Sequence, residues 1–258
     1  RLKSLGQAFE RRRLRGRAVD GHGDLHLDHI WFDERSRTPL IIDCLEFNED
    51  LRLIDTASDV AFLAMDLNYR ARPDLADAFL SAYALETDDY DLFSVVDFFQ
   101  AYRALVRAKV ASFATKQPMI EMRQRDQARS SASRHTKIAA SLLEPREPGE
   151  LVLLCGTVGS GKSTVARYLA DSGHGISIAS DRVRKTISEV PLTSHTNAGV
   201  DEGLYRPEMT ARVYSEMLDR AERVIGSGRT AILDASFSLR TFRDQAGDWA
   251  RERGLTPR

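Results

Sequence analysis

The hydrophobic positions of the chain follow two different rhythms. Over residues 55–114 they recur every three or four residues, which is the spacing of helices that bury one face. Beyond residue 149, short apolar runs alternate with helical patterns, as they do when strands and helices follow one another around a parallel sheet. The change of rhythm predicts two domains of different architecture.

The first domain is predicted to be mostly helical. Apolar side chains at helical spacing mark two faces that we expect to be buried: Val60, Leu63, Ala64 and Leu67 on one, and Val95, Phe98, Phe99 and Tyr102 on the other. The apolar runs 30–32 and 40–42 flank the turn-rich segment 33–38, and this order predicts a β-hairpin. The arginine-rich run at residues 11–17 is expected to be a solvated helix face.

A polar segment and two prolines mark the boundary between the domains. Residues 117–134 are rich in Arg, Gln and Ser, and a helical stretch at 137–143 follows them. Pro145 and Pro148 then end the helix. We expect a first domain at residues 1–125, a helical and polar linker at 126–149 and a second domain at 150–258.

The second domain is predicted to be a doubly wound α/β domain with a parallel sheet. Strands are expected at residues 151–155, 176–179 and 230–233, and helices at 162–170, 207–225 and 240–252. The longest helix is marked at both ends, because Pro207 lies in its first turn and Gly226 just beyond its last.

The turn that joins the first strand of this domain to its first helix fits the pattern G-x-x-x-x-G-K-S, at residues 156–163. Its glycines let the backbone curl so that N–H groups point at phosphate oxygens, and the helix N-terminus adds its positive dipole end. Lys162 can reach the β- and γ-phosphates, and the Ser163 hydroxyl can ligate Mg²⁺. We therefore expect ATP, or GTP in its place, to bind with Mg²⁺. The expected nucleotide-binding residues are Gly156, Thr157, Val158, Gly159, Ser160, Gly161, Lys162, Ser163 and Thr164.

Two carboxylates are expected beside this loop. Asp234 ends the third apolar strand and Asp181 follows the second, so both should face the crevice at the carboxyl edge of the sheet. Asp234 is a candidate Mg²⁺ ligand, and a turn or helix cap is its alternative role. Asp181 is a candidate base for an acceptor hydroxyl, and Arg184 a partner for an anionic substrate group. A helix cap with a solvated basic turn is the alternative for this pair.

Three segments of this domain, at residues 179–185, 204–208 and 232–237, resemble the P-loop kinases that include polynucleotide kinase and zeta-toxin-like proteins. The similarity covers residues 151–258 and indicates a kinase or AAA-type ATP-binding domain. It implies that Asp181 activates the acceptor hydroxyl and that a lid with arginines follows a fourth strand. We expect a fragment cut at both ends, because the chain begins with Arg1 and stops where another strand could begin.

A second candidate site lies near the N-terminus, where residues 22–26 read H-G-D-L-H. This segment resembles the catalytic loop of the aminoglycoside and choline phosphotransferases, which have a protein-kinase-like fold. The resemblance spans residues 1–115, the C-terminal lobe of that fold. It implies that Asp24 is the catalytic base, Asp43 a metal-binding aspartate and Asp59 a structural aspartate.

One position departs from this family. His29 stands where the family usually has an asparagine as second metal ligand, and imidazole is a poorer Mg²⁺ ligand than an amide oxygen. Phosphoryl transfer here is therefore expected to be weakened or lost. Two other interpretations stay open. The cluster at residues 22–29 could be purely structural, or a metallo-hydrolase site of the metallo-β-lactamase type, although Asp24 replaces the first histidine of the pattern H-x-H-x-D-H and no later histidine lies in residues 30–134. We expect no structural zinc.

Composition narrows the remaining choices. The formal net charge is −1, which gives no strong nucleic-acid signal, and no apolar stretch reaches the roughly 20 residues of a membrane span. The two cysteines, Cys44 and Cys155, are expected to be buried free thiols in a reducing cytoplasm. We expect an ATP-dependent phosphotransferase whose acceptor is an unidentified hydroxyl-bearing small molecule or polynucleotide end. The alternative is a nucleotide-regulated binding module without phosphoryl transfer.

Overall fold

The computed structural model describes residues 2–117, 119–191, 206–256 and 258. The chain forms two compact units, and neither is continuous in sequence. The first comprises Arg1–Ala76 and Ser94–Pro145, and the second comprises Asp77–Phe93 and Arg146–Arg258. No helix in the described part of the chain is long and apolar enough to cross a membrane.

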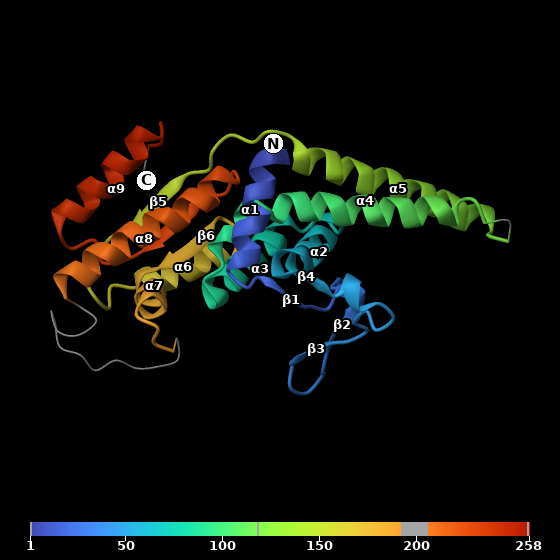
Figure 1. Ribbon diagram of the computed structural model, residues 1–258, viewed down its shortest axis with the longest axis horizontal. Coiled ribbons are helices and arrows are strands. Elements are labelled where there is room, and N and C mark those ends of the chain that lie inside the picture. Colours follow the sequence, from blue (N-terminus) through green and yellow to red (C-terminus); the bar gives the residue numbers. More distant parts are fainter. Residues whose placement is uncertain (1, 118, 192–205, 257) are drawn as a thin grey trace. The chain divides into compact units, whose positions relative to one another are not determined.

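The first unit is mostly helical, with two small antiparallel sheets (Figure 1). Its elements are α1 (Leu2–Leu14), β1 (Ala18–Asp20), η1 (Leu27–His29), β2 (Ile30–Phe32), β3 (Pro39–Ile41), η2 (Glu49–Leu51), β4 (Leu53–Asp55), α2 (Thr56–Tyr69), the start of α3 (Pro73–Thr87), α4 (Val96–Ala114) and α5 (Met122–Leu143). Strand β1 pairs with β4, and β2 pairs with β3. The second pairing confirms the predicted hairpin.

The core of this unit forms where α2, α4 and α5 meet. Its buried members are Phe62, Met65, Ala101, Ala104, Ala139 and Leu142. Helices α4 and α5 lie side by side along most of their length (Figure 1). Small alanines on both helices allow this close approach, and the burial of apolar surface between them stabilises the pair.

Two expectations for these helices were wrong in part. Tyr102 was expected on a buried face of α4, but it is 53% exposed. The face that packs inward carries Gln100, Ala101 and Ala104 instead, because α5 covers that side. The polar segment at residues 117–134 is largely helical, as part of α5, and a narrow stripe at His135, Ala139 and Leu142 is enough to bury one face.

The arginine run is not uniformly solvated, contrary to the expectation. Arg12 is 1% exposed, and its Nε and Nη2 donate to the carboxylate of Asp55 at 2.8 Å each. The same carboxylate caps α2 by accepting from the N–H of Ala57 at 2.8 Å. Arg12 is therefore buried as one half of an ion pair with Asp55.

The second unit is built on a parallel sheet with the strand order β5–β7–β6. Its elements are most of α3, η3 (Tyr90–Ser94), β5 (Leu151–Leu154), α6 (Lys162–Asp171), β6 (Ile176–Ala179), α7 (Ser180–Ile187), α8 (Pro207–Gly226), β7 (Ala231–Asp234) and α9 (Arg240–Glu252). Next to β5, the backbone of Arg258 donates to Leu151 and accepts from Leu153, at 2.9 Å in both cases. The predicted order of a mostly helical domain followed by an α/β domain with a parallel sheet is confirmed.

Residues 77–93 belong to the second unit, although they lie far from it in sequence. Ser177 in the edge strand β6 donates its N–H to Ser81 at 3.0 Å, and its carbonyl accepts from the Tyr90 hydroxyl at 2.7 Å. Four ion pairs add to these bonds: Asp77–Arg229, Glu86–Arg182, Asp88–Arg220 and Asp91–Arg223. This segment therefore covers the edge of the sheet that would otherwise present unpaired backbone groups.

The cysteines are less buried than expected. Cys155 is exposed and Cys44 is intermediate, and both are free thiols. Cys155 follows the last paired residue of β5, so the strand has already left the sheet at this position. The apolar run that suggested burial includes Cys155, but the strand ends one residue before it.

Candidate functional sites

The loop from residue 156 to residue 161 joins the end of β5 to the start of α6. Gly159 and Gly161 have φ angles of 80° and 87°, which residues with a side chain rarely adopt. A Cβ at Gly156 would lie 2.8 Å from the Ser160 hydroxyl oxygen. The glycines are thus required by the backbone path, and the loop has the shape that a phosphate-binding turn needs.

Lys162 is folded back over this loop. Its ammonium group donates to the carbonyl of Thr157 at 2.7 Å and lies 3.4 Å from the Ser160 hydroxyl. Val158 at the tip of the loop is 94% exposed, so the concave side is open to a ligand. The ammonium is thus held against the loop by two of the loop's own oxygen atoms.

Asp234 is the last residue of the central strand β7. Its register partners are Leu154 in β5 and Ala179 in β6, so the three strands end at one level. Asp234 is 8% exposed, and among the described residues its carboxylate has no hydrogen-bond or ion-pair partner. A buried carboxylate is stable when it is paired or binds a metal ion, and this position suits such a role.

The chain that follows Asp234 is fixed to the phosphate-binding loop by contacts that the sequence patterns missed. Gly156 donates its N–H to the carbonyl of Ser236 at 3.1 Å. Phe237, with a φ of 45°, donates its N–H to the hydroxyl of Tyr214 at 3.0 Å. Arg243 donates to the carbonyls of Phe237 and Ser238. These bonds hold the start of the loop at the carboxyl end of β7. The positive φ of Phe237 marks the strained turn that they support, and no local sequence pattern predicts it.

Asp181 and Arg184 lie on α7, directly after β6. Asp181 is 57% exposed at its side chain and pairs with Lys185 at 2.9 Å. Arg184 is 7% exposed, and its Nη1 lies 3.4 Å from the hydroxyl of Thr210 on α8. The aspartate is therefore open to solvent, whereas the arginine is packed between helices. Of the segment at residues 204–208, residues 204 and 205 lie outside the described part of the chain.

In the first unit, Asp59 holds the loop that carries the H-G-D-L-H sequence. Its two carboxylate oxygens accept from the N–H groups of His22 at 2.7 Å and Gly23 at 2.8 Å. A Cβ at Gly21 would lie 2.4 Å from the same carboxylate, so glycine is required there. Asp66 adds a further bond by accepting from the N–H of Leu27 at 3.0 Å.

The hydrogen bonds of His22 fix its tautomer. Nδ1 accepts from the N–H of Asp24 at 3.3 Å, so Nε2 carries the ring proton and donates to the carbonyl of Ile42 at 2.9 Å. Both nitrogens are used within the unit. His22 therefore links the loop to the residues after β3 and is not available as a ligand.

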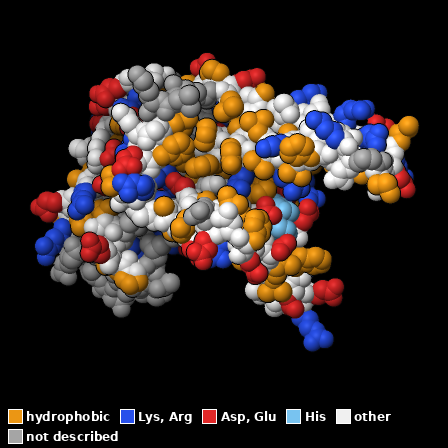
Figure 2. All heavy atoms as spheres, turned by 45° about the vertical axis from the view of Figure 1, so that its right-hand side comes forward, with side chains coloured by type: hydrophobic (Ala, Val, Ile, Leu, Met, Phe, Trp, Pro, Cys, Tyr) orange, Lys and Arg blue, Asp and Glu red, His pale blue; other side chains and the backbone are white. Residues whose placement is uncertain are grey.

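His26 and His29 face the carboxylate of Asp24. Their rings are 4.0 Å apart between centroids, and His26 also packs on Phe62. Burial lowers the pKa of His26 below its ordinary value, and the nearby His29 lowers it further. Figure 2 shows histidine side chains in pale blue at the surface, next to acidic side chains in red. Asp24, His26 and His29 offer ligand atoms that all lie within 4.8 Å of one another.

Asp43 adjoins this group from the chain after β3. Its Oδ2 lies 3.3 Å from Nε2 of His29, and its side chain is 76% exposed. The φ of Asp43 is 62°, a left-handed conformation that aspartate tolerates better than most residues. The sequence-predicted residues Asp24, His29 and Asp43 are thus brought together in the first unit.

Comparison with known families identifies both units. Residues 3–95 match a phosphotransferase enzyme family, and residues 151–258 match an AAA domain family. The chain is a fusion of these two kinds of domain. The predicted combination of a phosphotransferase-like domain with a P-loop domain is confirmed, and both matches support a kinase-type phosphotransferase that uses a nucleotide.

Similar proteins occur in mycobacteria. The chain is 38% identical over 229 residues to Uncharacterized protein Rv2004c of Mycobacterium tuberculosis and to Uncharacterized protein Mb2027c of Mycobacterium bovis. The matched region is 89% of this chain and 44% of each relative, so the chain spans less than half the length of these proteins. No solved structure matches the chain.

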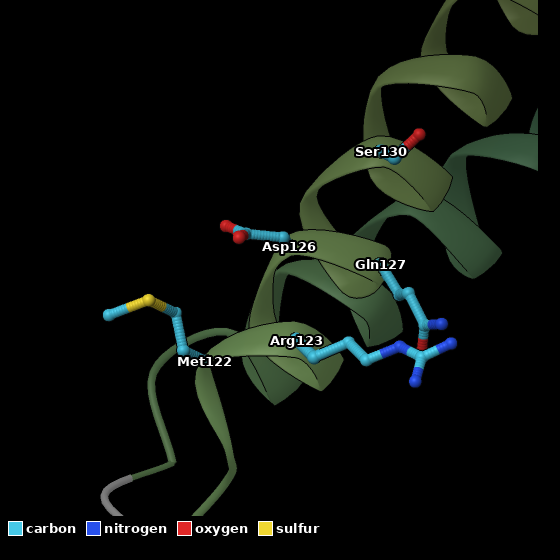
Figure 3. A pocket seen from close by; sticks show the side chains of 5 residues that line it. All are labelled: Met122, Arg123, Asp126, Gln127 and Ser130. Carbon is cyan, nitrogen blue, oxygen red and sulfur yellow. The ribbon is translucent and has the colours of Figure 1, made fainter.

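Apart from the two sites, a shallow depression lies on the first turns of α5, after the phosphotransferase match. Its lining residues are Met122, Arg123, Asp126, Gln127 and Ser130. Figure 3 shows Met122 and Asp126 extending away from Arg123 and Gln127. The polar groups do not converge on one point, and the depression has no part in either site.

Proposed function

We propose that the AAA domain transfers the γ-phosphoryl group of ATP to a hydroxyl group of a small molecule or a polynucleotide end. The observation that carries this proposal is the buried carboxylate of Asp234 at the end of β7, with no cationic partner among the described residues and with the phosphate-binding loop fixed beside it. A P-loop kinase needs a carboxylate at this place to support Mg²⁺.

In this proposal the loop residues divide the binding of ATP between them. The backbone of residues 156–161 and the N-terminus of α6 bind the phosphates, and Lys162 neutralises charge on the transferred group. Ser163 and Asp234 would hold Mg²⁺, which polarises the phosphate oxygens when it is bound. The three glycines and the open side of the loop fit this role.

Asp181 is the proposed base for the acceptor hydroxyl. It is exposed and lies just after β6, whose last residue is in register with Asp234. The buried Arg184 bonds Thr210, so we propose that it acts on an anionic acceptor chiefly by fixing α7 on α8. Lys185 pairs with Asp181 at 2.9 Å and holds its carboxylate on the exposed side of α7.

The phosphotransferase domain carries the second candidate site, with Asp24 as base and Asp43 and His29 as metal ligands. We assign the transfer to the AAA domain because imidazole replaces an oxygen ligand at residue 29 and Asp43 is mostly exposed. Both features weaken Mg²⁺ binding in the first unit.

The experiment measures Mg·ATP affinity and phosphoryl transfer with candidate acceptors, on a chain extended to the length of its relatives. Lys162→Ala should weaken ATP binding about 10- to 150-fold, since a charge-assisted hydrogen bond of about 1.5–3 kcal/mol is lost. The exposed Lys137→Ala serves as the matched control. Equal affinities in the two variants would refute nucleotide binding at this loop.

Two further variants separate transfer from binding. Asp234→Asn should weaken the dependence of ATP binding on Mg²⁺. Asp181→Asn should leave ATP binding nearly intact and lower transfer by roughly 10²–10⁴, the usual effect of losing a general base. If transfer is absent in the wild type while ATP still binds, the domain is a nucleotide-regulated binding module, the alternative that the sequence left open.

A further inference from the structure

Hydrogen bonding within the first unit leaves His29 with one nitrogen directed at a carboxylate. The carbonyl of Asp24 can only accept, so Nδ1 of His29 carries its proton and donates at 3.0 Å. In the neutral ring, Nε2 then presents a lone pair to Oδ2 of Asp43 at a distance of 3.3 Å. Two electron-rich atoms at this separation repel each other unless a cation lies with them.

His26 also has a ring nitrogen beside a carboxylate, and it is more buried than His29. The residue is 6% exposed, and its Nδ1 is buried without a hydrogen-bond partner. Its Nε2 lies 3.5 Å from Oδ2 of Asp24. Its Nδ1 lies 3.7 Å from Oδ2 of Asp28, so both ring nitrogens face carboxylates, and the described residues supply no donor to the nitrogen that lacks the ring proton. A buried polar atom left in this way calls for an explanation.

We propose that Asp24, His26 and His29 form a binding site for a divalent transition-metal ion, with Asp43 as an additional ligand. Two ligand atoms that each lie about 2.0–2.1 Å from a tetrahedral Zn²⁺ are about 3.3 Å apart. The distances of 3.3 Å between His29 and Asp43 and 3.5 Å between His26 and Asp24 are close to this value. One ligand atom from each of Asp24, His26 and His29 lies within 4.8 Å of the other two. Asp43 lies outside this group, so its exposed side chain would have to shift to reach an ion held by the other three.

The donor set selects the class of metal. Two imidazoles with one or two carboxylates suit Zn²⁺, Mn²⁺, Fe²⁺ or Co²⁺, whereas Mg²⁺ prefers oxygen ligands throughout. The bond from Nδ1 of His29 to the Asp24 carbonyl is the kind that fixes the ring of a metal-binding histidine. The side chain of Asp24 is 33% exposed, so one side of the site remains open to water or a substrate oxygen.

This inference goes beyond the proposed function, which concerns the other unit, and it departs from the expectation that the cluster at residues 22–29 holds no structural zinc. It also changes the role of Asp24. A carboxylate that binds the metal is not free to accept a proton from an acceptor hydroxyl, so the site would not work as the catalytic loop of a phosphotransferase. It would instead be a metal centre built on that loop.

The test uses the 258-residue chain after removal of metal by a chelator, with Co²⁺ as the spectroscopic probe. We expect one bound Co²⁺ with visible absorption bands, which Zn²⁺ displaces and excess Mg²⁺ does not. Asp234→Asn removes the candidate carboxylate of the other unit and should leave this signal unchanged. His29→Asn and Asp24→Asn should each weaken Co²⁺ binding by at least roughly tenfold.

The exposed His174→Asn is the matched control, and its Co²⁺ binding should equal that of the wild type. Thermal unfolding of the metal-free variants shows whether each is folded, and Asp24→Asn, at a more exposed position, replaces His29→Asn if the latter unfolds. The proposal is overturned if neither Co²⁺ nor Zn²⁺ binds, if Mg²⁺ displaces Co²⁺ equally well, or if the bands persist in both ligand variants.

Discussion

Tyr90→Phe tests whether residues 77–93 are an integral part of the second unit. Tyr90 is 3% exposed, and its hydroxyl donates to the carbonyl of Ser177 at 2.7 Å. The substitution removes one oxygen atom and leaves the ring in place. The carbonyl of Ser177 points away from β7, so no other strand supplies a donor in exchange.

The expected loss follows from what the carbonyl is left with. A buried acceptor without its partner costs about 1–3 kcal/mol. The second unit has about 130 residues, and at roughly 2.1 cal/mol/K of unfolding entropy per residue this loss lowers its Tm by about 4–11 °C. The effect is large enough to measure in a single variant.

The dependence of the unfolding free energy on pH gives an independent test. Burial raises the pKa of Tyr90 in the folded unit, so the unfolded chain releases this proton first as the pH rises through about 10. The stability contributed by the buried phenol is present below that pH and is lost above it. Tyr90→Phe should lack this part of the alkaline destabilisation.

The assay is urea unfolding followed by tryptophan fluorescence in a Trp31→Phe background, so that Trp249 of α9 reports on the second unit alone. Tyr83→Phe on α3, within the same segment, is the control, since the described residues offer its hydroxyl no partner, and it should stay within about 0.5 kcal/mol of the background. If Tyr90→Phe behaves like Tyr83→Phe, the bond to Ser177 does not contribute and our account of the segment is wrong.

Two further variants test the first unit. Asp59→Asn should destabilise it by about 1.5–3 kcal/mol in urea unfolding, because one of the two N–H groups at His22 and Gly23 then faces an amide donor, whereas the exposed Glu34→Gln should change little. His135, whose pKa is lowered by burial, binds a proton first in the unfolded chain, so the unfolding free energy should fall as the pH drops below about 6.5. His135→Gln should flatten that slope, and an unchanged slope would contradict the assignment.

The second unit was predictable because its signals are local. A fully apolar strand, a glycine-rich turn and a helix follow one another within about twenty residues, and each has a pattern that needs no distant partner. Asp234 could be located for the same reason, since it directly ends an apolar run. Its buried position between two other strand ends depends only on the parallel order of the sheet.

The features that escaped prediction all depend on distant partners. Arg12 looks like its neighbours in an arginine run, and only Asp55, 43 residues away, makes it a buried residue. Gln100 looks polar, yet it is fully buried and bonds Asn68, while Tyr102 is exposed. Which side of a helix is covered is decided by the helix that packs on it, and the sequence of α4 alone does not contain that information.

The covered edge of β6 shows why domain matches and folding units differ in this chain. The phosphotransferase match ends at residue 95, but residues 77–93 within it belong to the second unit, where they bond the backbone of Ser177 and pair with four arginines. Conversely, helices α4 and α5 lie outside that match and yet supply four of the six buried members of the first core. Helix α3 begins in one unit and continues into the other without a break. Ser58 in the phosphotransferase match bonds Arg103, which lies beyond the end of that match, and Ser177 in the AAA match bonds Tyr90, which lies within the other match. Each matched region therefore depends on residues outside its own bounds to pair its buried polar groups.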